Sequence, residues 1–594
     1  MRWLPPLVLC VLAAGVRFFR IDAQSLWYDE GISAFQLTRS FAEILRAAAL
    51  DTHPPLYYWT LKAWSEVFGA SELGLRSLSA VSGVAAVGLT WLIGRKLFGR
   101  LPATLAAVLL AVAPLGVYYS QEVRMYTQVT ALAMLAAYAY VRRGDWLYAI
   151  AGILTLYSQY LGIAILAALN LHALVWWRTR SRREWLMWLG ANAAIGVAFL
   201  PWLPTFLDQQ THALNVSPRT LQGLALQTVQ AYGGGLAHGD VLLAAGIVLV
   251  ALALIGVVLS RQWTECTLAL LLWLMPLGLV LALGLRSGLF EVRYLVLSLP
   301  GLMLLAAHGI TRLLRLPALT AAAAALLVVP ASLALSQQYF EPALARDNYR
   351  GLVQTIEDGA RPTDAVVLSA PNQTEIFTYY YRGDLPMYPL PAQRPIDADD
   401  TRRRLEAIRS GHERVWLVQW AMNEADPRGV IQNWLTENGF KATHQWYGSV
   451  QLALIGFAPP NAPTERLDVE LDNGIVLEGY RLPSRTLKPG ETLALTLVWR
   501  AEGPTATPWK VFTHLVDGEP SVVAQRDAEP ADNLRPTTGW KPGERIEDNY
   551  GILVPDELPA GAYMLEIGMY SGEQRAHFDG QGDHLVLGQV QVTP

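Results

Sequence analysis

The chain has 594 residues, of which 52% are hydrophobic and only 16% are charged. Soluble globular proteins contain about 25% charged residues, so this composition indicates a protein that is largely embedded in lipid. The net charge is −4 and no basic patch stands out, so we expect no nucleic-acid partner.

Apolar runs separated by short polar links extend to about residue 337. A helix needs about 20 apolar residues to cross a bilayer, and the runs predict about eleven spanning helices. The predicted spans cover residues 4–20, 74–94, 102–120, 126–141, 146–159, 160–177, 185–204, 241–260, 264–284, 293–311 and 317–335. The long link between the first two spans contains amphipathic stretches, residues 32–48 and 56–68, that suit the membrane interface.

The distribution of arginine and lysine predicts the orientation, because short cytoplasmic loops are enriched in both. Five alternate links carry these residues, and they all lie on one side if the N-terminus is cytoplasmic. The residues are Arg95, Lys96, Arg100, Arg142, Arg143, Arg178, Arg180, Arg182, Arg183, Arg261, Arg312 and Arg315. We therefore predict a multi-pass protein of the cell membrane whose C-terminal domains are extracytoplasmic.

After the last span the sequence resembles soluble protein. Residues 339–460 alternate helical and strand-like patterns, which predicts a small α/β domain, and a proline-rich link follows. Residues 461–594 show alternating strands with Pro-Gly turns, which predicts a β-sandwich. The predicted fold is a polytopic α-helical membrane domain, residues 1–338, followed by these two extracytoplasmic domains.

The predicted sandwich contains several large aromatic residues. They are Trp499, Trp509, Trp540, Tyr550 and Tyr570. Aromatic residues in a sandwich belong to the core more often than to a glycan-binding surface. We assign this domain an accessory role, either in engaging an acceptor or in packing over the active site.

Short polar motifs fall in order on the predicted outer face of the membrane domain. They are Asp29-Glu30, His53-Pro54-Pro55-Leu56, Leu75-Arg76-Ser77-Leu78-Ser79, Tyr119-Ser120-Gln121-Glu122-Val123-Arg124-Met125-Tyr126 and Glu291-Val292-Arg293-Tyr294. Ionisable groups near lipid are costly, so their collection at one membrane surface indicates a functional site.

This series of motifs resembles the type C glycosyltransferases. The most similar branches are the protein O-mannosyltransferases and the bacterial family that includes the lipid A aminoarabinose transferases, and the resemblance covers about residues 1–340. It implies an inverting membrane enzyme that moves a sugar from a polyprenyl-phosphate donor to a hydroxyl of a protein, glycan or lipid. Ile32 stands where the aminoarabinose branch has arginine, so the substrate of that branch is not carried over.

The resemblance also implies roles for the carboxylates. A hydroxyl is a poor nucleophile, so a carboxylate within hydrogen-bond reach should take its proton as it attacks. The resemblance assigns this role to Asp29, while Glu30 orients the base or positions the acceptor. Glu122 could join Asp29 around the acceptor or a divalent cation. The alternative is that Asp29 and Glu30 merely mark the outer end of a helix.

The phosphate of the donor needs positive charge around it as the bond to the sugar breaks. Arg76, Arg124 and Arg293 are the candidates, because planar guanidinium groups bind phosphate through two hydrogen bonds. The alternative for each is an interfacial arginine that extends toward water. His53 either donates to the phosphate or braces its loop. Metal dependence stays open, since no tight cluster of metal ligands appears.

Three tyrosines complete the predicted site. Tyr294 is a candidate for donor-phosphate contact, and Tyr57 and Tyr58 are candidates for contacts in the acceptor loop. Anchoring in the membrane interface is the alternative for all three.

Two other functions compete with a transferase. A flippase for lipid-linked saccharides should show inverted repeats and helices that are broken near the midplane, whereas the polar motifs here collect at one face. A surface glycan-binding scaffold needs only one or two membrane helices.

Overall fold

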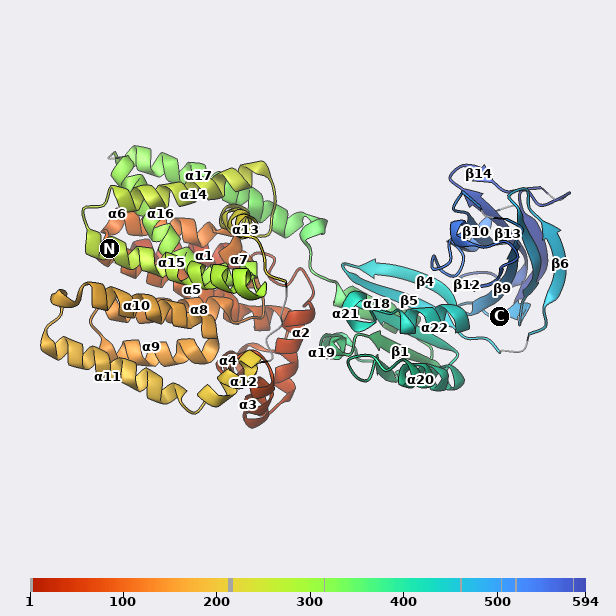
Figure 1. The fold of residues 1–594 in the computed structure, drawn as a ribbon, viewed down its shortest axis with the longest axis horizontal. Coiled ribbons are helices and arrows are strands. Elements are labelled where there is room, and N and C mark those ends of the chain that lie inside the picture. Colours follow the sequence, from red (N-terminus) through yellow and green to blue (C-terminus); the bar gives the residue numbers. More distant parts are fainter. Residues whose placement is uncertain are drawn as a thin grey trace. The chain divides into compact units, whose positions relative to one another are not determined.

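The computed structural model describes residues 4–211, 217–314, 316–459, 462–503, 505–518, 521–580 and 582–594. The chain forms two compact units, Met1–Arg346 and Asp347–Pro594 (Figure 1). The boundary that the sequence predicts at residues 460 and 461 lies outside the described residues, so the division into three domains stays a prediction.

The first unit is helical. Its α-helices are α1 (Leu4–Phe18), α2 (Tyr28–Phe35), α3 (Phe41–Leu50), α4 (Leu56–Phe68), α5 (Glu72–Leu97), α6 (Arg100–Val112), α7 (Pro114–Tyr118), α8 (Tyr126–Val141), α9 (Asp145–Ser158), α10 (Ile163–Val175), α11 (Arg182–Phe199), α12 (Leu203–Thr211), α13 (Leu221–Gly234), α14 (Asp240–Val258), α15 (Trp263–Ser287), α16 (Leu299–Leu313) and α17 (Pro317–Phe340). The 3₁₀-helices η2 (Tyr119–Gln121) and η5 (Val292–Ser298) precede α8 and α16. Each segment predicted as a span is largely helical, although the segments over residues 102–120 and 185–204 are each interrupted by a bend.

Five of the described helical segments are long and apolar enough to cross a membrane: α5, α14, α15, the continuous η5–α16 segment and α17. Two helix pairs, α6–α7 and α11–α12, qualify only as bent segments, with bends of 58° and 64°. These helices confirm a polytopic helical membrane protein with a C-terminal sheet region. The count of eleven spans stays a prediction.

The bend between α6 and α7 leads directly to candidate site residues. Pro114 has no N–H group, so carbonyl groups at the end of α6 need another donor. Arg17 of α1, which is buried, donates to Ala111 O at 2.7 Å and to Leu110 O at 3.3 Å. Its Nε also donates to Ser120 Oγ at 3.1 Å. Arg17 thereby fastens α1 to the broken segment and to the η2 turn behind it.

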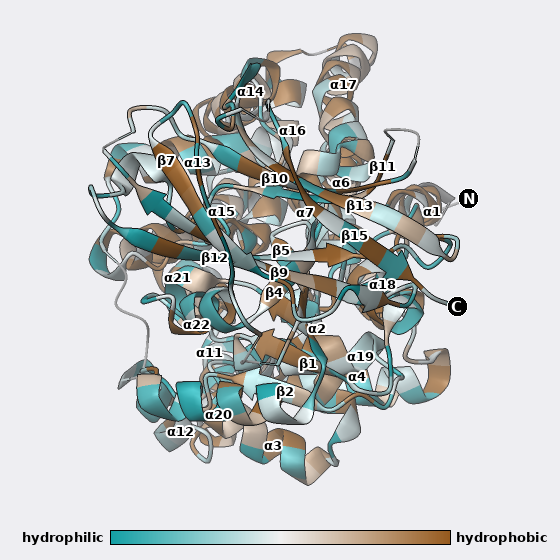
Figure 2. Cartoon of the chain, turned by 90° about the vertical axis from the view of Figure 1, so that its right-hand side faces the viewer, coloured by the Kyte–Doolittle hydropathy of each residue, from teal (hydrophilic) through white to brown (hydrophobic). Residues whose placement is uncertain are grey.

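The second unit begins with a five-stranded sheet of order β2-β1-β3-β5-β4. Its strands are β1 (Asp364–Ser369), β2 (Met387–Leu390), β3 (Arg414–Gln419), β4 (Phe440–Tyr447) and β5 (Val450–Gly456). Pairs β1–β2 and β1–β3 are parallel, whereas β3–β5 and β4–β5 are antiparallel. The helices of this part are α18 (Tyr349–Gly359), α19 (Thr374–Tyr380), α20 (Ala398–Gly411), α21 (Met422–Ala425) and α22 (Val430–Asn438). Figure 2 shows the largely hydrophilic α20 and the hydrophobic β1 that lies in the core.

The rest of the second unit consists of two sheets of orders β11-β10-β13-β15-β8 and β12-β9-β7-β6, with β14 beside β13. The strands are β6 (Glu465–Glu470), β7 (Ile475–Arg481), β8 (Thr486–Leu487), β9 (Thr492–Ala501), β10 (Lys510–Val516), β11 (Val522–Ala528), β12 (Arg545–Leu553), β13 (Gly561–Ser571), β14 (Gln574–Arg575) and β15 (Leu585–Val592). One apolar core joins both sheets. Trp499, Trp509, Trp540 and Tyr550 belong to this core, as the sequence predicts, and Tyr570 is half-buried.

Candidate active site

The two carboxylates of the first motif, Asp29 and Glu30, point in different directions because they are consecutive residues of a helix. Asp29 and Glu30 lie in the first turn of α2, where the helix dipole favours negative charge. Adjacent helical residues point about 100° apart, so the two side chains meet different partners. Glu30 turns into the protein and is fully buried, whereas the Asp29 side chain keeps 17% of its surface exposed.

Glu30 forms a buried ion pair with Arg76 of α5. Arg76 Nη2 and Nε donate to the two carboxylate oxygens at 2.6 and 2.8 Å. Neither side chain is exposed. Burial alone would raise the pKa of Glu30, but the charge and hydrogen bonds of Arg76 outweigh it and lower that pKa. The amide N–H of Val123 also donates to Glu30, at 2.9 Å, so this pair holds three separate segments together.

The other N–H groups of Arg76 are also engaged. They donate to main-chain carbonyls of the loop between α1 and α2, on Ile21, Gln24 and Ser25, at 2.7–2.9 Å. With all five N–H groups used inside the protein, Arg76 braces the loop. Its assignment to the donor phosphate stays a prediction that this geometry does not favour.

Asp29 meets an arginine from a distant part of the chain. Arg293 of η5 donates through Nη1 to Asp29 Oδ2 at 2.5 Å. The same nitrogen lies 3.4 Å from the hydroxyl of Tyr126, and Nη2 donates to Glu291 Oε2 at 3.3 Å. About one fifth of the Arg293 side chain is exposed, so this ion pair lies at an accessible surface. Tyr294, the next residue, packs its ring near Tyr126 at 6.4 Å.

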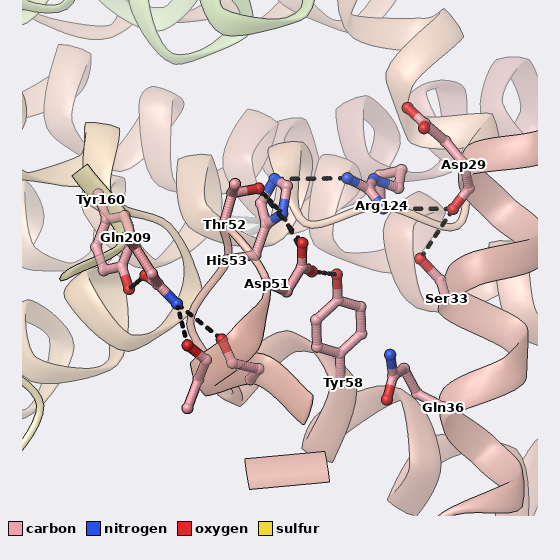
Figure 3. Close-up of polar contacts among 12 residues, drawn as sticks. Asp29, Ser33, Gln36, Asp51, Thr52, His53, Tyr58, Arg124, Tyr160 and Gln209 are labelled. Carbon is pink, nitrogen blue, oxygen red and sulfur yellow. Dashed lines mark hydrogen bonds and ion pairs between the residues drawn. The ribbon is translucent and has the colours of Figure 1, made fainter. Parts of the chain in front are cut away.

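A second arginine reaches the same place from the loop after η2. Arg124 Nη1 donates to the main-chain oxygen of Asp29 at 3.3 Å, and Nη2 lies 3.5 Å from His53 Nε2 (Figure 3). Since arginine can only donate, His53 accepts through Nε2 and its ring is neutral. Burial lowers the pKa of His53, and this outweighs the contact with Asp51.

The His53 ring is held by the loop that precedes α4. Its Nδ1 lies 3.1 Å from Thr52 Oγ1 and 3.6 Å from Asp51 Oδ2, and Tyr58 donates to the same Asp51 oxygen at 3.3 Å (Figure 3). Burial raises the pKa of Asp51, but hydrogen bonds from His53 and Thr52 outweigh it and lower the pKa to about 2. The ionised Asp51 therefore orients His53, which in turn orients Arg124.

The start of this loop is fastened from α12. Gln209 Nε2 donates to the carbonyl oxygen of Ala48 at 2.8 Å, at the C-terminal end of α3 (Figure 3). Tyr160 donates to Gln209 Oε1 at 2.5 Å, and Trp202 Nε1 donates to Tyr160 at 2.8 Å. A chain of side chains thus fixes the segment that delivers Asp51.

The side chain of Glu122, directly after η2, is also fully buried. Within the described residues, neither carboxylate oxygen has a hydrogen-bond partner. Burial raises the pKa of Glu122 to about 7, and Glu30 and Asp29 add to this rise while Arg346 opposes it. The charge of Asp29 therefore acts on Glu122, although no contact joins the two, and their pairing around an acceptor or a divalent cation stays a prediction.

Arg346 belongs to this environment and sequence reasoning missed it. It lies after α17 at the end of the first unit, and its guanidinium packs over the ring of Tyr118 at 4.5 Å. Its main-chain N–H donates to Gln24 Oε1 at 3.0 Å. Asp51 and Tyr126 were also missed, although Tyr126 belongs to one of the motifs and Asp51 lies two residues before another. Arg346 follows no motif, so only the fold reveals it.

The remaining predicted residues are close to these groups. Tyr57 and Tyr58 of α4 are buried and pack edge to face at 5.7 Å.

Among the described residues, no group of three or more His, Cys, Asp or Glu side chains is placed to hold a metal ion.

Comparisons with known proteins confirm the resemblance to type C glycosyltransferases. The family model of dolichyl-phosphate-mannose-protein mannosyltransferase matches residues 52–204, a segment that contains His53, Arg76, Glu122 and Arg124. No curated protein shows significant similarity in a sequence search.

The fold is similar to that of ArnT from Cupriavidus metallidurans. The apo structure of that protein shares 14% sequence identity, with a TM-score of 0.53, and the similarity covers 75% of this chain and 97% of ArnT. The structure of ArnT bound to undecaprenyl phosphate gives a TM-score of 0.51, also at 14% identity, and covers 76% and 97% of the two chains.

Proposed function

We propose that this chain is a membrane glycosyltransferase that moves a sugar from a polyprenyl-phosphate carrier to an acceptor hydroxyl. The observation that carries the proposal is the meeting of Asp29 with Arg293 and Arg124 at one accessible point. The family match and the ArnT fold, seen with undecaprenyl phosphate in that protein, support the same donor class. The other substrates and partners are an acceptor hydroxyl on protein, glycan or lipid, and membrane lipids.

Asp29 is the base in this proposal. The acceptor oxygen forms a bond to the anomeric carbon while the bond from that carbon to the phosphate oxygen breaks. The hydroxyl proton moves to Asp29, and the polyprenyl phosphate leaves with the electron pair. A single displacement of this kind inverts the anomeric configuration. Partial exposure of Asp29 leaves room for the acceptor to approach.

Arg293 and Arg124 bind the leaving phosphate. Both already donate to Asp29, one to the carboxylate and one to the main chain, so a phosphate held between them lies next to the base. Preorganised guanidinium groups stabilise the negative charge that develops on the leaving group. The His53 ring accepts from Arg124, so we assign His53 the role of holding Arg124 in place. Tyr294, Tyr57 and Tyr58 lie near these residues.

Glu30 and Arg76 hold the site without touching the reacting atoms. Their buried pair joins α2 to α5 and to the loop that carries Arg124. The outer-face orientation, with a cytoplasmic N-terminus and extracytoplasmic second unit, belongs to the proposal because it rests on the arginine and lysine distribution. We assign the sheet region an accessory role.

The test uses purified protein in detergent with polyprenyl-phosphate mannose and a panel of acceptors. Asp29→Asn should lower the transfer rate by about 10²–10⁴-fold, the usual contribution of a general base. Asp22→Asn, at an exposed position of the same loop, is the matched control and should keep its rate within about twofold.

Two results would contradict the proposal. One is Asp29→Asn with a rate equal to that of the Asp22 control. The other is movement of the lipid-linked sugar across vesicle membranes, unchanged in Asp29→Asn, with no transfer to any acceptor. The second result would establish the flippase alternative.

A further inference from the structure

The second unit contains two cavities that share one lining residue, Glu437 of α22. Each cavity has a volume of about 250 Å³. Small-molecule sites begin at about 300 Å³, so each cavity has room for one small unit, such as a single sugar ring. Because Glu437 lines both cavities, a ligand of two linked units can occupy them together.

The first cavity lies between α20 and α22 (Figure 2), and we call it the helix cavity. Its polar groups come from Arg402, Arg428, Asn433 and Glu437. Trp434 supplies an aromatic surface and keeps 8% of its own surface exposed. The Trp434 ring belongs to the core of this part of the unit, which fixes its position.

The second cavity lies where the end of α22 meets β7, β9 and β12, and we call it the junction cavity (Figure 1). Asn549 of β12 fastens its two walls together. Its Nδ2 donates to the carbonyl oxygens of Thr436 and Glu437 at 3.3 and 2.9 Å. Its Oδ1 accepts from the Thr496 hydroxyl at 2.7 Å. The walls of this cavity are therefore held in a fixed arrangement before any ligand arrives.

The junction cavity has the same kinds of groups as the helix cavity. Arg409 of α20 and Arg481 of β7 line it, together with Asn438 and the aromatic ring of Phe440. Arg409 Nη1 donates to Asn438 Oδ1 at 3.4 Å, so these two side chains lie side by side. Each cavity thus combines two arginines, an asparagine amide, the shared Glu437 and one aromatic ring.

The charge of the lining is nearly balanced, which disfavours a strongly charged ligand. Three of the four arginines already pair with carboxylates outside the cavities. These pairs are Arg402–Asp399 at 3.1 Å, Arg409–Glu406 at 3.7 Å and Arg481–Glu547 at 2.5 Å. The fourth, Arg428, shares its cavity with the opposite charge of Glu437. Arginine has five N–H groups, so each paired guanidinium still has donors for a neutral ligand.

The mixture of groups selects a ligand rich in hydroxyls. Arginine can only donate hydrogen bonds and an ionised carboxylate can only accept them, whereas a hydroxyl does both. Neighbouring hydroxyls of one sugar ring therefore satisfy an arginine and Glu437 together. The aromatic ring of each cavity can cover the apolar face of the sugar. A phosphate only accepts, so it gains nothing from Glu437 and is repelled by its charge.

We infer that the helix and junction cavities form a binding site for a neutral saccharide, with two linked rings on either side of Glu437. This inference deepens the proposed function, on which it rests for the role of the ligand, because it selects a glycan among the possible acceptors. Binding of the saccharide can be measured without any transfer reaction.

The experiment measures binding to purified full-length protein in a detergent that has no sugar head group. The saccharide probes are mannose, glucose, mannobiose, maltose and cellobiose, and the comparison probes are inorganic phosphate and a peptide rich in serine and threonine. At least one disaccharide should bind, about tenfold or more tightly than its monosaccharide, because the second ring binds intramolecularly. Phosphate and the peptide should not compete with it.

The shared residue gives the most direct variant. Glu437→Ala should weaken binding of that disaccharide by about tenfold or more, because it removes a charged acceptor from both cavities. Glu424→Ala, at an exposed position of α21, is the matched control and should stay within about twofold of the unmutated protein. Thermal unfolding of both variants checks that each is folded.

Variants confined to one cavity test the arrangement of two rings. Arg402→Met changes only the helix cavity, and Arg481→Met changes only the junction cavity. Each should lower the affinity for the disaccharide by about tenfold, toward that of the monosaccharide. Arg403→Met, at the exposed residue beside Arg402, is the control and should change the affinity by less than about twofold.

Several results would overturn the inference. They are binding of none of the saccharides, competition by phosphate or by the peptide, equal affinity for disaccharide and monosaccharide, and a Glu437→Ala affinity equal to that of the Glu424 control. The comparison of one ring with two uses the unmutated protein, so it does not depend on how the variants fold. Saccharide binding without any transfer would retain the site and remove the proposed function, whereas transfer without saccharide binding would do the reverse.

Discussion

The two units each bury a carboxylate, and the surroundings of the two groups differ. Asp548 of β12, in the sheet region, accepts from Tyr550 at 2.7 Å, from the amide of Ala531 at 2.7 Å and from Trp499 at 3.3 Å. Glu122, in the membrane unit, accepts from none of the residues that the structure describes. Burial raises the pKa of both, to about 6 and about 7.

A less polar interior of the membrane unit does not explain the difference, because that unit fully satisfies Glu30, another buried carboxylate of the candidate site. Glu30 is paired with Arg76 there as closely as Asp364 is paired with Arg414 in the second unit, where two hydrogen bonds of 2.7 and 2.9 Å join them. Unsatisfied groups that persist beside complete networks are typical of functional sites. The contrast therefore separates carboxylates that complete a hydrogen-bond network from Glu122, which completes none among the described residues.

The largest loss of stability should come from removing the arginine of either buried ion pair, Glu30–Arg76 or Asp364–Arg414. Arg76→Met leaves Glu30 buried without its partner, and Arg414→Met does the same to Asp364. Each should lower the free energy of unfolding by about 3–5 kcal/mol. Thermal unfolding in detergent measures this, with Arg404→Met on the exposed face of α20 as the control, expected within about 0.5 kcal/mol. A loss in only one unit would show that the two pairs are not equivalent.

The next largest loss of stability should come from Asp548, the buried carboxylate of the sheet region that accepts three hydrogen bonds. Asp548→Ala removes the acceptor of three donors, of which the Tyr550 hydroxyl and the Trp499 indole are buried, and should destabilise the protein by about 2–4 kcal/mol. The measurement is made at pH 5, where Asp548 is largely protonated because its pKa is about 6, so that relief of a buried charge does not mask the loss. Asp399→Ala, at an exposed position of α20, should change stability by less than about 0.5 kcal/mol. Equal stability of the two variants would remove the contrast with Glu122.

Hydropathy predicted the helices well because lipid imposes a length and a composition on each one. It missed the break at Pro114, which lies inside the single span predicted over residues 102–120, although a proline within an apolar run was a usable signal. It also missed α13, which was assigned to an outer loop. The helix α13 packs against α14, the helix that follows it, so α13 forms without an apolar run long enough to cross a bilayer.

The candidate site was predicted in part, for a related reason. Motif order placed Asp29, Arg124 and Arg293 on one face, and the structure brings them into contact. Motif order did not reveal that Glu30 and Arg76, which are 46 positions apart, would form a buried ion pair with each other. Arg346 carried no local signal, because its place over the ring of Tyr118 depends on how the chain continues after α17.

The last and smallest effect tests the unpaired carboxylate itself. The pKa of Glu122 rises from 4.5 to about 7 on folding, so its stabilising contribution is present below pH 4.5 and is lost as the pH rises through 7. Glu122→Gln removes this loss and should stabilise the protein at pH 8 by up to about 3 kcal/mol, while changing little at pH 5. Unfolding temperatures at both pH values check this, with Glu66→Gln at an exposed position of α4 as the control. Destabilisation at pH 8 would mean that Glu122 is paired in the folded protein. Stabilisation at pH 8 would show that the wild-type chain keeps a buried charge at a cost to its own stability, as functional sites do.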